Sequence, residues 1–322
     1  MNIRKAAIIG CGFVGAASAF SLMQSGLFSE LVLIDVDRTR AEGEALDISH
    51  GLPFARPMQI YAGTYADLSD AAIVIVCAGA GQKPGETRLD LVRKNIEVFR
   101  NIIPQIAAVN QEAILLIVTN PVDVLTYAAV RFSGYPENRV FGTGTVLDTA
   151  RLKYLLGQHL QVDPRSVHAF IIGEHGDSEI AAWSGASVSG VPLRDFCEMR
   201  GHFDHESAMQ DLAERVRTSA YRIIEKKQAT YYGIAMSVRR ICEAIVRDEK
   251  SVLPVSSVQH GMFGVEDVAL SIPAVVGKDG VETTVPIELS DAETAALRRS
   301  AETLRQVIEQ ALPPESAGKT FP

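Results

Sequence analysis

Cysteine is scarce in this sequence, and its spacing excludes two classes of protein. Only four cysteines occur in 322 residues, namely Cys11, Cys77, Cys197 and Cys242, and no two of them form a C-x-x-C pair. Isolated thiols of this kind are typical of a reduced protein, and not of a zinc site or of a small secreted domain held by disulfides. We therefore expect free cysteines, no bound metal and a cytoplasmic protein.

Long hydrophobic runs and an excess of basic charge are also missing. No apolar segment reaches the ~18 residues that a membrane span needs. The first five residues lead directly into a short strand-like run, and not into the apolar core of a signal peptide. Lys and Arg number 31 against 39 Asp and Glu, which gives a net charge of −8. An acidic protein repels phosphate backbones, so we expect neither a membrane nor nucleic acid as a partner.

The first half of the chain alternates short apolar runs with segments of helix length. The runs 6–9, 31–34, 73–77 and 114–118 are apolar throughout, as in parallel strands that are covered on both faces. Helices are predicted for 14–25, 38–49 and 88–110. Such alternation predicts an α/β fold with a doubly wound parallel sheet.

The second half has the pattern of an α+β domain. Short strands are predicted at 169–172 and 191–193, and a long helical stretch at 205–248 has a break near 228–230. Three runs, at 252–258, 268–276 and 281–289, predict an antiparallel meander with Gly and Pro turns. Ser290 with Glu293 three residues later predicts a capping box that opens a last helix. We place the domain boundary at residue 143, which gives domains 1–143 and 144–322.

A glycine motif follows the first predicted strand. Gly10, Gly12 and Gly15 form G-x-G-x-x-G at the start of a helix, and Asp35 closes the next strand 20 residues later. The glycines permit a tight turn that brings a pyrophosphate to the helix N-terminus. Asp35 would accept from ribose hydroxyls and repel a 2′-phosphate, which favours NAD over NADP. The alternative is a packing turn that binds nothing; the first reading makes 1–143 an NAD-binding Rossmann domain.

Polar residues occur at the ends of predicted strands, where ligands bind in a doubly wound sheet. Asn120 ends the fourth strand and can donate to a substrate, or can simply form a turn before Pro121. His175 follows an apolar strand and suits proton transfer near neutral pH, although a turn histidine or a metal ligand fits the same position. No second His or Cys stands at ligand spacing. Asp148 and Arg151 share a helix face, or form only a surface ion pair.

The order of these motifs resembles the L-lactate/L-malate dehydrogenase family, and most closely its bacterial L-lactate dehydrogenases. The motifs are the glycine fingerprint, Asp35, QKPGETR, VTNPVD, LDTAR and GEHGD, and the resemblance extends from Lys5 to about Leu312. It implies an NAD-dependent enzyme that transfers hydride reversibly between NADH and pyruvate, with 144–322 as its catalytic domain. It also implies a homo-oligomer, either a tetramer or a dimer of the same kind.

The resemblance implies four catalytic roles. His175 gives a proton to the pyruvate carbonyl or accepts it from L-lactate, and Asp148 pairs with it and favours the imidazolium. Arg151 binds the substrate carboxylate with its planar fork. Arg88 lies on a closing loop and polarises the carbonyl as negative charge develops on oxygen. Closure of this loop would expel water and can limit turnover.

The resemblance also implies which residues bind substrate. Asn120 and Thr230 complete a polar wall, and Gln82 faces the variable end of the substrate. Malate dehydrogenases carry an arginine at the position of Gln82, and a neutral amide leaves a second carboxylate without a cation. Gln82 therefore predicts pyruvate over oxaloacetate, with malate dehydrogenase as the alternative. A non-catalytic NAD(H) sensor is a remote alternative, since it would need none of the four catalytic residues.

Other positions match the family's cofactor and effector contacts. The predicted NAD contacts are Gly10, Gly12, Val14, Gly15, Asp35, Gly79, Ala80, Asn95, Val118, Thr119, Asn120, Thr143 and Ile234. Relatives bind fructose 1,6-bisphosphate through an arginine and a histidine. His168 matches the histidine, while Lys153 replaces the arginine and lacks its bidentate fork, which predicts a weakened or altered effector site. Gln228 stands where glycine is usual, which puts the helix break there in doubt.

Overall fold

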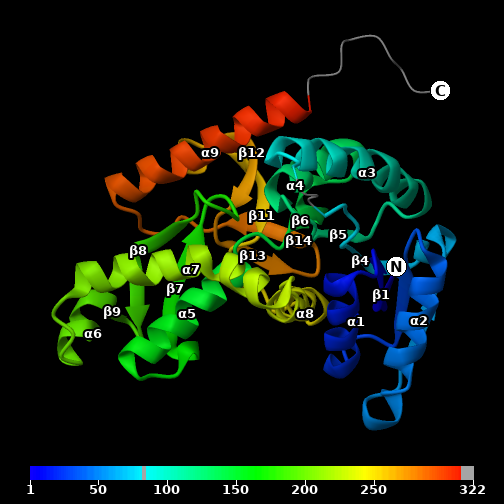
Figure 1. The fold of residues 1–322 in the computed structure, drawn as a ribbon, viewed down its shortest axis with the longest axis horizontal. Coiled ribbons are helices and arrows are strands. Elements are labelled where there is room, and N and C mark those ends of the chain that lie inside the picture. The colour runs from blue at the N-terminus through cyan, green and yellow to red at the C-terminus, as the bar shows by residue number, and fades with distance from the viewer. Residues whose placement is uncertain (82–84, 313–322) are drawn as a thin grey trace.

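The first half of the chain forms a parallel sheet of six strands. The computed structural model describes residues 1–81 and 85–312 (Figure 1). The parallel strands are β1 (Asn2–Ile9), β2 (Glu30–Ile34), β3 (Gln59–Ala62), β4 (Ala71–Val76), β5 (Ile114–Ile117) and β6 (Val140–Gly142). They lie in the order β3-β2-β1-β4-β5-β6, so the strand order reverses between β1 and β4. This is the doubly wound sheet that the apolar runs predict, and the reversal marks the position where such sheets bind ligands.

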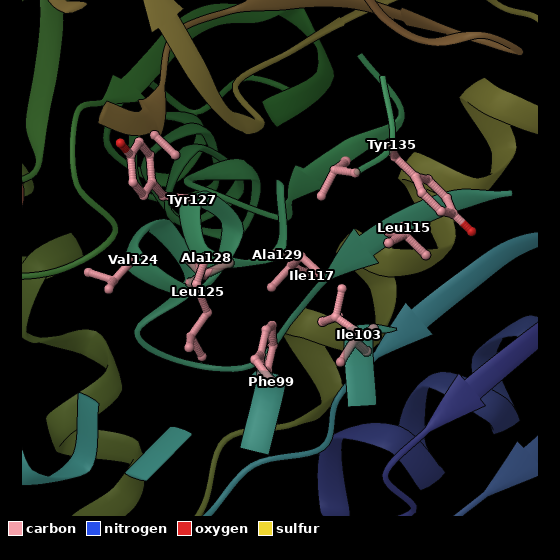
Figure 2. Close-up of a cluster of buried hydrophobic side chains, with 14 of the residues drawn as sticks. Phe99, Ile103, Leu115, Ile117, Val124, Leu125, Tyr127, Ala128, Ala129 and Tyr135 are labelled. Carbon is pink, nitrogen blue, oxygen red and sulfur yellow. The ribbon is translucent and has the colours of Figure 1, made fainter. Parts of the chain in front are cut away.

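Two hydrophobic cores cover the two faces of this sheet. On one face pack α3 (Arg88–Val109) and α4 (Val122–Ser133), with α9 (Asp291–Ala311) beside them. Figure 2 shows part of this core, where Phe99 and Ile103 of α3 meet Leu115 and Ile117 of β5 and the apolar side of α4. On the other face pack α1 (Phe13–Ser25), α2 (Arg38–Ser49) and α8 (Tyr232–Val246). Burial on both faces explains why the strands are apolar throughout.

A second sheet and its helices form a third core. The strands are β7 (Val167–Ile172), β8 (Ile180–Val188) and β9 (Val191–Pro192), and the helices are α5 (Val146–Leu160), α6 (Leu193–Met199) and α7 (His205–Lys227). Short 3₁₀ turns occur at η1 (Leu52–Phe54), η2 (Tyr65–Leu68), η3 (Glu137–Arg139), η4 (Pro164–Ser166) and η5 (Met262–Gly264). Within the described ranges, no helix has the length and apolar content of a membrane span. The boundary at residue 143 stays a prediction.

The predicted single meander is wrong, because its three runs divide into five strands in two sheets. The strands are β10 (Ser251–Leu253), β11 (Ser256–His260), β12 (Glu266–Ser271), β13 (Ala274–Gly277) and β14 (Gly280–Thr284). The β11–β12 hairpin joins β6 and extends the large sheet, while β10, β13 and β14 form a sheet of their own. Pro254 and Pro273 stand between the separated strands, and a proline cannot donate to a strand ladder.

The predicted break near 228–230 and the predicted start of the last helix at Ser290 are both confirmed. The α7 helix ends at Lys227, its capping residue Gln228 adopts the left-handed conformation with φ of 68°, and α8 begins four residues after Gln228. The break is therefore present without the usual glycine. At the start of α9, the Ser290 hydroxyl accepts from the Glu293 N–H at 3.2 Å, and the Glu293 carboxylate accepts from the Ser290 N–H at 2.7 Å. This is the predicted capping box.

Candidate active site

The glycine turn after β1 has the geometry of a dinucleotide cradle. Gly10 has φ of 97°, and a Cβ there would collide with the backbone at Ala78. A Cβ at Gly15 would overlap the Gly10 carbonyl oxygen, whereas Gly12 faces open space at the N-terminus of α1. The Asp35 carboxylate accepts from the Cys11 N–H at 2.6 Å, which ties the end of β2 to this turn. The turn thus leaves room for a phosphate beside unpaired helix N–H groups.

A cleft of about 680 Å³ runs along this turn at the carboxyl ends of the parallel strands. Five predicted cofactor residues line it, namely Gly10, Gly12, Asp35, Gly79 and Ala80. The buried Asn95 accepts from the Ala80 N–H at 2.7 Å and donates to the Asn120 carbonyl at 2.9 Å, so it holds two of the strand-end loops together. The other predicted contacts are not in its lining: Val14, Gly15, Asn95, Val118, Thr119, Asn120, Thr143 and Ile234.

Three of the predicted catalytic side chains are bonded to one another. His175 follows β7, and its Nδ1 lies 2.5 Å from Oδ2 of Asp148 in the first turn of α5. Oδ1 of Asp148 accepts from Nη1 of Arg151 at 2.6 Å. The Asp148 side chain is 2% exposed and that of Arg151 14%. The i, i+3 pair is therefore not a surface ion pair but a buried link between the histidine and the arginine.

The charges of this group fix the protonation of His175. Burial disfavours the imidazolium, but the Asp148 carboxylate, with smaller contributions from Asp123 and from Glu179 where it is ionised, outweighs it and raises the pKa of His175 to about 9. Burial also disfavours ionised Asp148, yet His175 and Arg151 hold the pKa of its carboxyl below the ordinary value. At neutral pH the site therefore contains an imidazolium that can give up a proton.

Arg88, the first residue of α3, reaches the loop that contains His175. Its Nη2 donates to Oε1 of the buried Glu174 at 2.5 Å, and its Nη1 lies 3.4 Å from Asp177. Tyr221 of α7 donates to the same Asp177 at 2.8 Å. These contacts hold the arginine beside the histidine, and they connect α3, the His175 loop and α7.

A cavity of about 400 Å³ brings the predicted catalytic residues together. Its lining includes Arg88, Asn120, Asp148, Arg151 and His175. Thr230 is half-buried in the α7–α8 connection and is not in this lining. Gln82 lies outside the described residues, so its placement stays a prediction. The cavity offers the guanidinium groups of Arg88, Arg151 and Arg217 and the imidazolium of His175, which suits a small anion with a carbonyl or hydroxyl group.

The sequence interpretation missed several residues of the site. Asp123 of α4 is buried, and its carboxylate accepts from the His175 N–H at 2.7 Å and from the Ser256 hydroxyl at 2.6 Å. Burial raises the pKa of Asp123 to about 6. An acidic residue within the apolar start of α4 was the available signal. Glu179 and Arg217 also line the cavity, but no motif singled them out.

A second cavity, of about 390 Å³, contains the two predicted effector residues. Lys153 of α5 and His168 of β7 both line it, and so does Arg240 of α8, which the sequence did not indicate. Burial lowers the pKa of Lys153. Arg240 is bonded to Glu249 and Ser251, each at 2.6 Å. The cavity therefore gathers three basic side chains from three elements.

Comparison with known proteins matches nearly the whole chain. Residues 4–142 match the NAD binding domain of lactate/malate dehydrogenase, and residues 145–313 match its alpha/beta C-terminal domain. The L-lactate dehydrogenase of Acetivibrio thermocellus is 51% identical over 307 residues, which are 95% of this chain and 97% of the relative. That of Thermoanaerobacter pseudethanolicus is 52% identical over 308 residues, covering 96% and 99%. The crystal structure of a minor L-lactate dehydrogenase from Enterococcus mundtii in a ligands-bound form superimposes with a TM-score of 0.94 at 43% identity, covering 97% and 99%.

Proposed function

The chain belongs to the lactate/malate dehydrogenase family, and we propose that it acts as an NAD-dependent L-lactate dehydrogenase. It interconverts pyruvate and L-lactate by reversible hydride transfer. The observation that carries the proposal is the bonded Arg151–Asp148–His175 group in one cavity with Arg88. The test is NADH oxidation by the purified protein with pyruvate and with oxaloacetate, where pyruvate is the expected substrate.

The cofactor would lie in the glycine-lined cleft, where a side chain at Gly10 or Gly15 would collide with backbone. Bound NADH supplies the hydride. Asp35 at the end of β2 is placed to accept from the adenosine ribose, and Asn95 fixes the loops on which Ala80 and Asn120 lie. The remaining predicted contacts, Val14 and Ile234 among them, would complete the binding surface.

His175 acts as the proton donor to the carbonyl in pyruvate reduction and as the acceptor in lactate oxidation. Asp148 orients the ring through Nδ1, which leaves Nε2 as the atom that exchanges the proton. Because the pKa of His175 is raised to about 9, the donor form predominates at neutral pH. Asp123 supports the same arrangement by holding the His175 backbone N–H.

Two arginines would bind and polarise the substrate. Arg151 uses one Nη1–H on Asp148, and a guanidinium has four further N–H groups with which to bind a carboxylate in bidentate fashion. Arg88 would stabilise negative charge on the carbonyl oxygen. In the structure Glu174 and Asp177 hold Arg88 next to His175, so it has a short path to the reacting carbonyl.

Selection between pyruvate and oxaloacetate is assigned to Gln82 on the sequence alone. A neutral amide gives a second carboxylate no cation, and a buried unpaired charge costs several kcal/mol. Asn120 and Thr230 would form the polar wall of the pocket. The presence of Asn120 in the cavity lining supports this role for Asn120. Malate dehydrogenase activity is the second candidate, and Gln82 is the residue that argues against it.

We also propose the cavity of Lys153 and His168 as an effector site for fructose 1,6-bisphosphate. Support comes from the three basic side chains around one cavity, which suit a phosphate group. Lysine in place of arginine would weaken the site, because a single ammonium cannot bind phosphate through a fork. Pyruvate saturation curves with and without the bisphosphate test this proposal, and superimposable curves would refute it.

Assembly as a homo-oligomer, with a tetramer as the expected form, is supported by exposed apolar side chains. Phe13 and Phe20 on α1, and Tyr232 and Met236 on α8, are each at least half exposed, and the two helices lie side by side (Figure 1). Such a patch fits contact with a second copy, and light scattering of the purified protein tests it. The four free cysteines support a reducing location such as the cytoplasm.

A further inference from the structure

Glu179 is a buried acid in the active-site cavity that the proposed mechanism does not use. It lies four residues after His175, is 8% exposed and contributes to the cavity lining. Its Oε1 atom is buried and has no hydrogen-bond partner among the residues that the structure describes. A buried carboxylate without a donor or a cation is strongly disfavoured, so this group favours its neutral form.

The charged groups around Glu179 come from several elements, and none of them pairs with it within the described part of the chain. Asp148 and Arg151 face it from α5, His175 from its own loop and Arg217 from α7. Arg217 is bonded instead to Glu214, at 2.6 Å. Burial first, and then the negative charge of Asp148, raise the pKa of Glu179 to about 8, although the three cations oppose this.

Arg88, Asp177 and Tyr221 line the same cavity but are engaged with one another and with Glu174. Arg88 bonds to Glu174 and lies near Asp177, which in turn accepts from the Tyr221 hydroxyl. These two carboxylates offset the charge of Arg88. The charge that a substrate meets deeper in the cavity is therefore set by the group around Asp148.

The charge balance of that deeper group depends on Glu179. Arg151 and the His175 imidazolium are positive, while Asp148 and the carboxylate of Asp123 beside the His175 N–H are negative, so the group has no spare positive charge. An ionised Glu179 would make it one unit negative before the substrate arrives. The substrate carboxylate would then enter a site that contains three carboxylates for two cations, and like charges in a buried site repel strongly.

We propose that Glu179 is a positioning residue that must carry a proton for the 2-oxo acid anion to bind at Arg151. The proton removes one negative charge from the cavity and leaves Arg151 and His175 directed at the substrate instead of at Glu179. The inference rests on the proposed function, because it assumes an anionic 2-oxo acid in this cavity. It adds a proton uptake that accompanies substrate binding and is separate from the proton that His175 transfers.

The proposal predicts both the direction and the size of the change in the KM for pyruvate with pH. Glu179 is protonated below its pKa and ionised above it, so affinity for pyruvate is full near pH 7 and falls as the pH rises through about 8. Between pH 7 and pH 9, ionisation of Glu179 alone raises the KM for pyruvate about tenfold. Ionisation of His175, with its pKa of about 9, adds only about twofold over the same interval.

The test is the pH dependence of KM in the wild type and in Glu179→Gln, whose amide imitates the protonated acid. The wild-type KM should rise about 20-fold from pH 7 to pH 9, and that of Glu179→Gln about twofold, with similar values at pH 7. Asp177→Asn is the matched control, because its carboxylate lines the same cavity but is 60% exposed; its KM should rise as steeply as that of the wild type. The proposal would be overturned if KM rose by the same factor between pH 7 and pH 9 in the wild type and in Glu179→Gln. It would also be overturned if the KM of Glu179→Gln at pH 7 were tenfold above that of the wild type.

A second measurement needs no variant. Oxamate, an isostere of pyruvate that hydride does not reduce, is titrated calorimetrically into the protein with NADH at pH 8, in buffers of different ionisation enthalpy. Binding should take up about half a proton, most of it by Glu179. Binding without proton uptake contradicts the proposal. Wild-type turnover of pyruvate at pH 7 separately tests the proposed function. Failure of the Glu179 proposal is therefore distinguishable from failure of the proposed function.

Discussion

Replacing Asp148 by Asn should make the loss of activity depend steeply on pH. The isosteric amide keeps the shape of the Asp148 side chain but removes the charge that stabilises the His175 imidazolium. Without it the pKa of His175 should fall from about 9 to no more than its ordinary 6.5, because burial still disfavours the charged ring. At pH 8 the imidazolium fraction then falls from about 0.9 to about 0.03, which is roughly 30-fold.

At pH 6, with a variant pKa of 6.5, the same change costs only about 1.3-fold, because His175 is then largely protonated in both the wild type and the variant. Weaker binding of the substrate by Arg151, which loses its bond to Asp148, lowers activity at every pH. The distinctive result is therefore that the ratio of wild-type to variant kcat/KM for pyruvate grows about 20-fold between pH 6 and pH 8.

The assay is the initial rate of NADH oxidation at subsaturating pyruvate across this range. Glu86→Gln provides a matched control, since this carboxylate forms an ion pair with Lys94 of α3 and does not line the cavity. Its activity ratio to the wild type should be constant with pH. A ratio for Asp148→Asn that is the same at pH 6 and pH 8 would refute the assignment of Asp148 as the group that holds the proton on His175.

Three further predictions concern single positions. Gln82→Arg should shift kcat/KM toward oxaloacetate by about 100-fold or more relative to pyruvate, because it supplies the missing cation; an unchanged substrate ratio would argue against this role for residue 82. Gln228→Gly should raise the free energy of unfolding by about 0.5–1 kcal/mol in urea, because Gln228 has φ of 68° and glycine adopts this conformation without strain; a decrease would mean that the glutamine side chain itself stabilises the turn. Asp123→Ala should lower the same free energy by about 2–4 kcal/mol, since it leaves the His175 N–H and the Ser256 hydroxyl without their acceptor; an unchanged urea midpoint would contradict the importance of this contact.

The sequence predicted those parts of the fold that depend on local pattern. The parallel strands β1, β2, β4 and β5, the helices between them and the α9 capping box have signals within a few neighbouring residues, and all are present. The strands β3, β6 and β8 were missed. The strand β3 is only partly buried, β6 has three residues and β8 is rich in Ala, Ser and Gly, so their pairing depends on neighbours that are distant in sequence.

In the candidate site too, the sequence indicated the residues that belong to motifs but not those that depend on three-dimensional packing. The family resemblance grouped His175, Asp148, Arg151 and Arg88, and all four line one cavity; their catalytic roles stay predictions. The only local signal for Asp123 was its place in the apolar start of α4, and the burial of Glu179 has no local signal, because an acidic residue after a short polar motif is equally compatible with a solvated position. Among the residues that the structure describes, Oε1 of Glu179 has no hydrogen-bond partner, and this becomes visible only in the packing of α5 and α7 around it.

The single most direct test is the comparison of pyruvate with oxaloacetate as substrates of the purified protein, in NADH oxidation at pH 7. The proposed function predicts rapid turnover of pyruvate and a kcat/KM at least about 100-fold below it for oxaloacetate, given several kcal/mol for an unpaired buried carboxylate. Equal or better turnover of oxaloacetate would contradict L-lactate dehydrogenase activity, and no turnover of either would contradict the catalytic assignment of Arg151, Asp148 and His175.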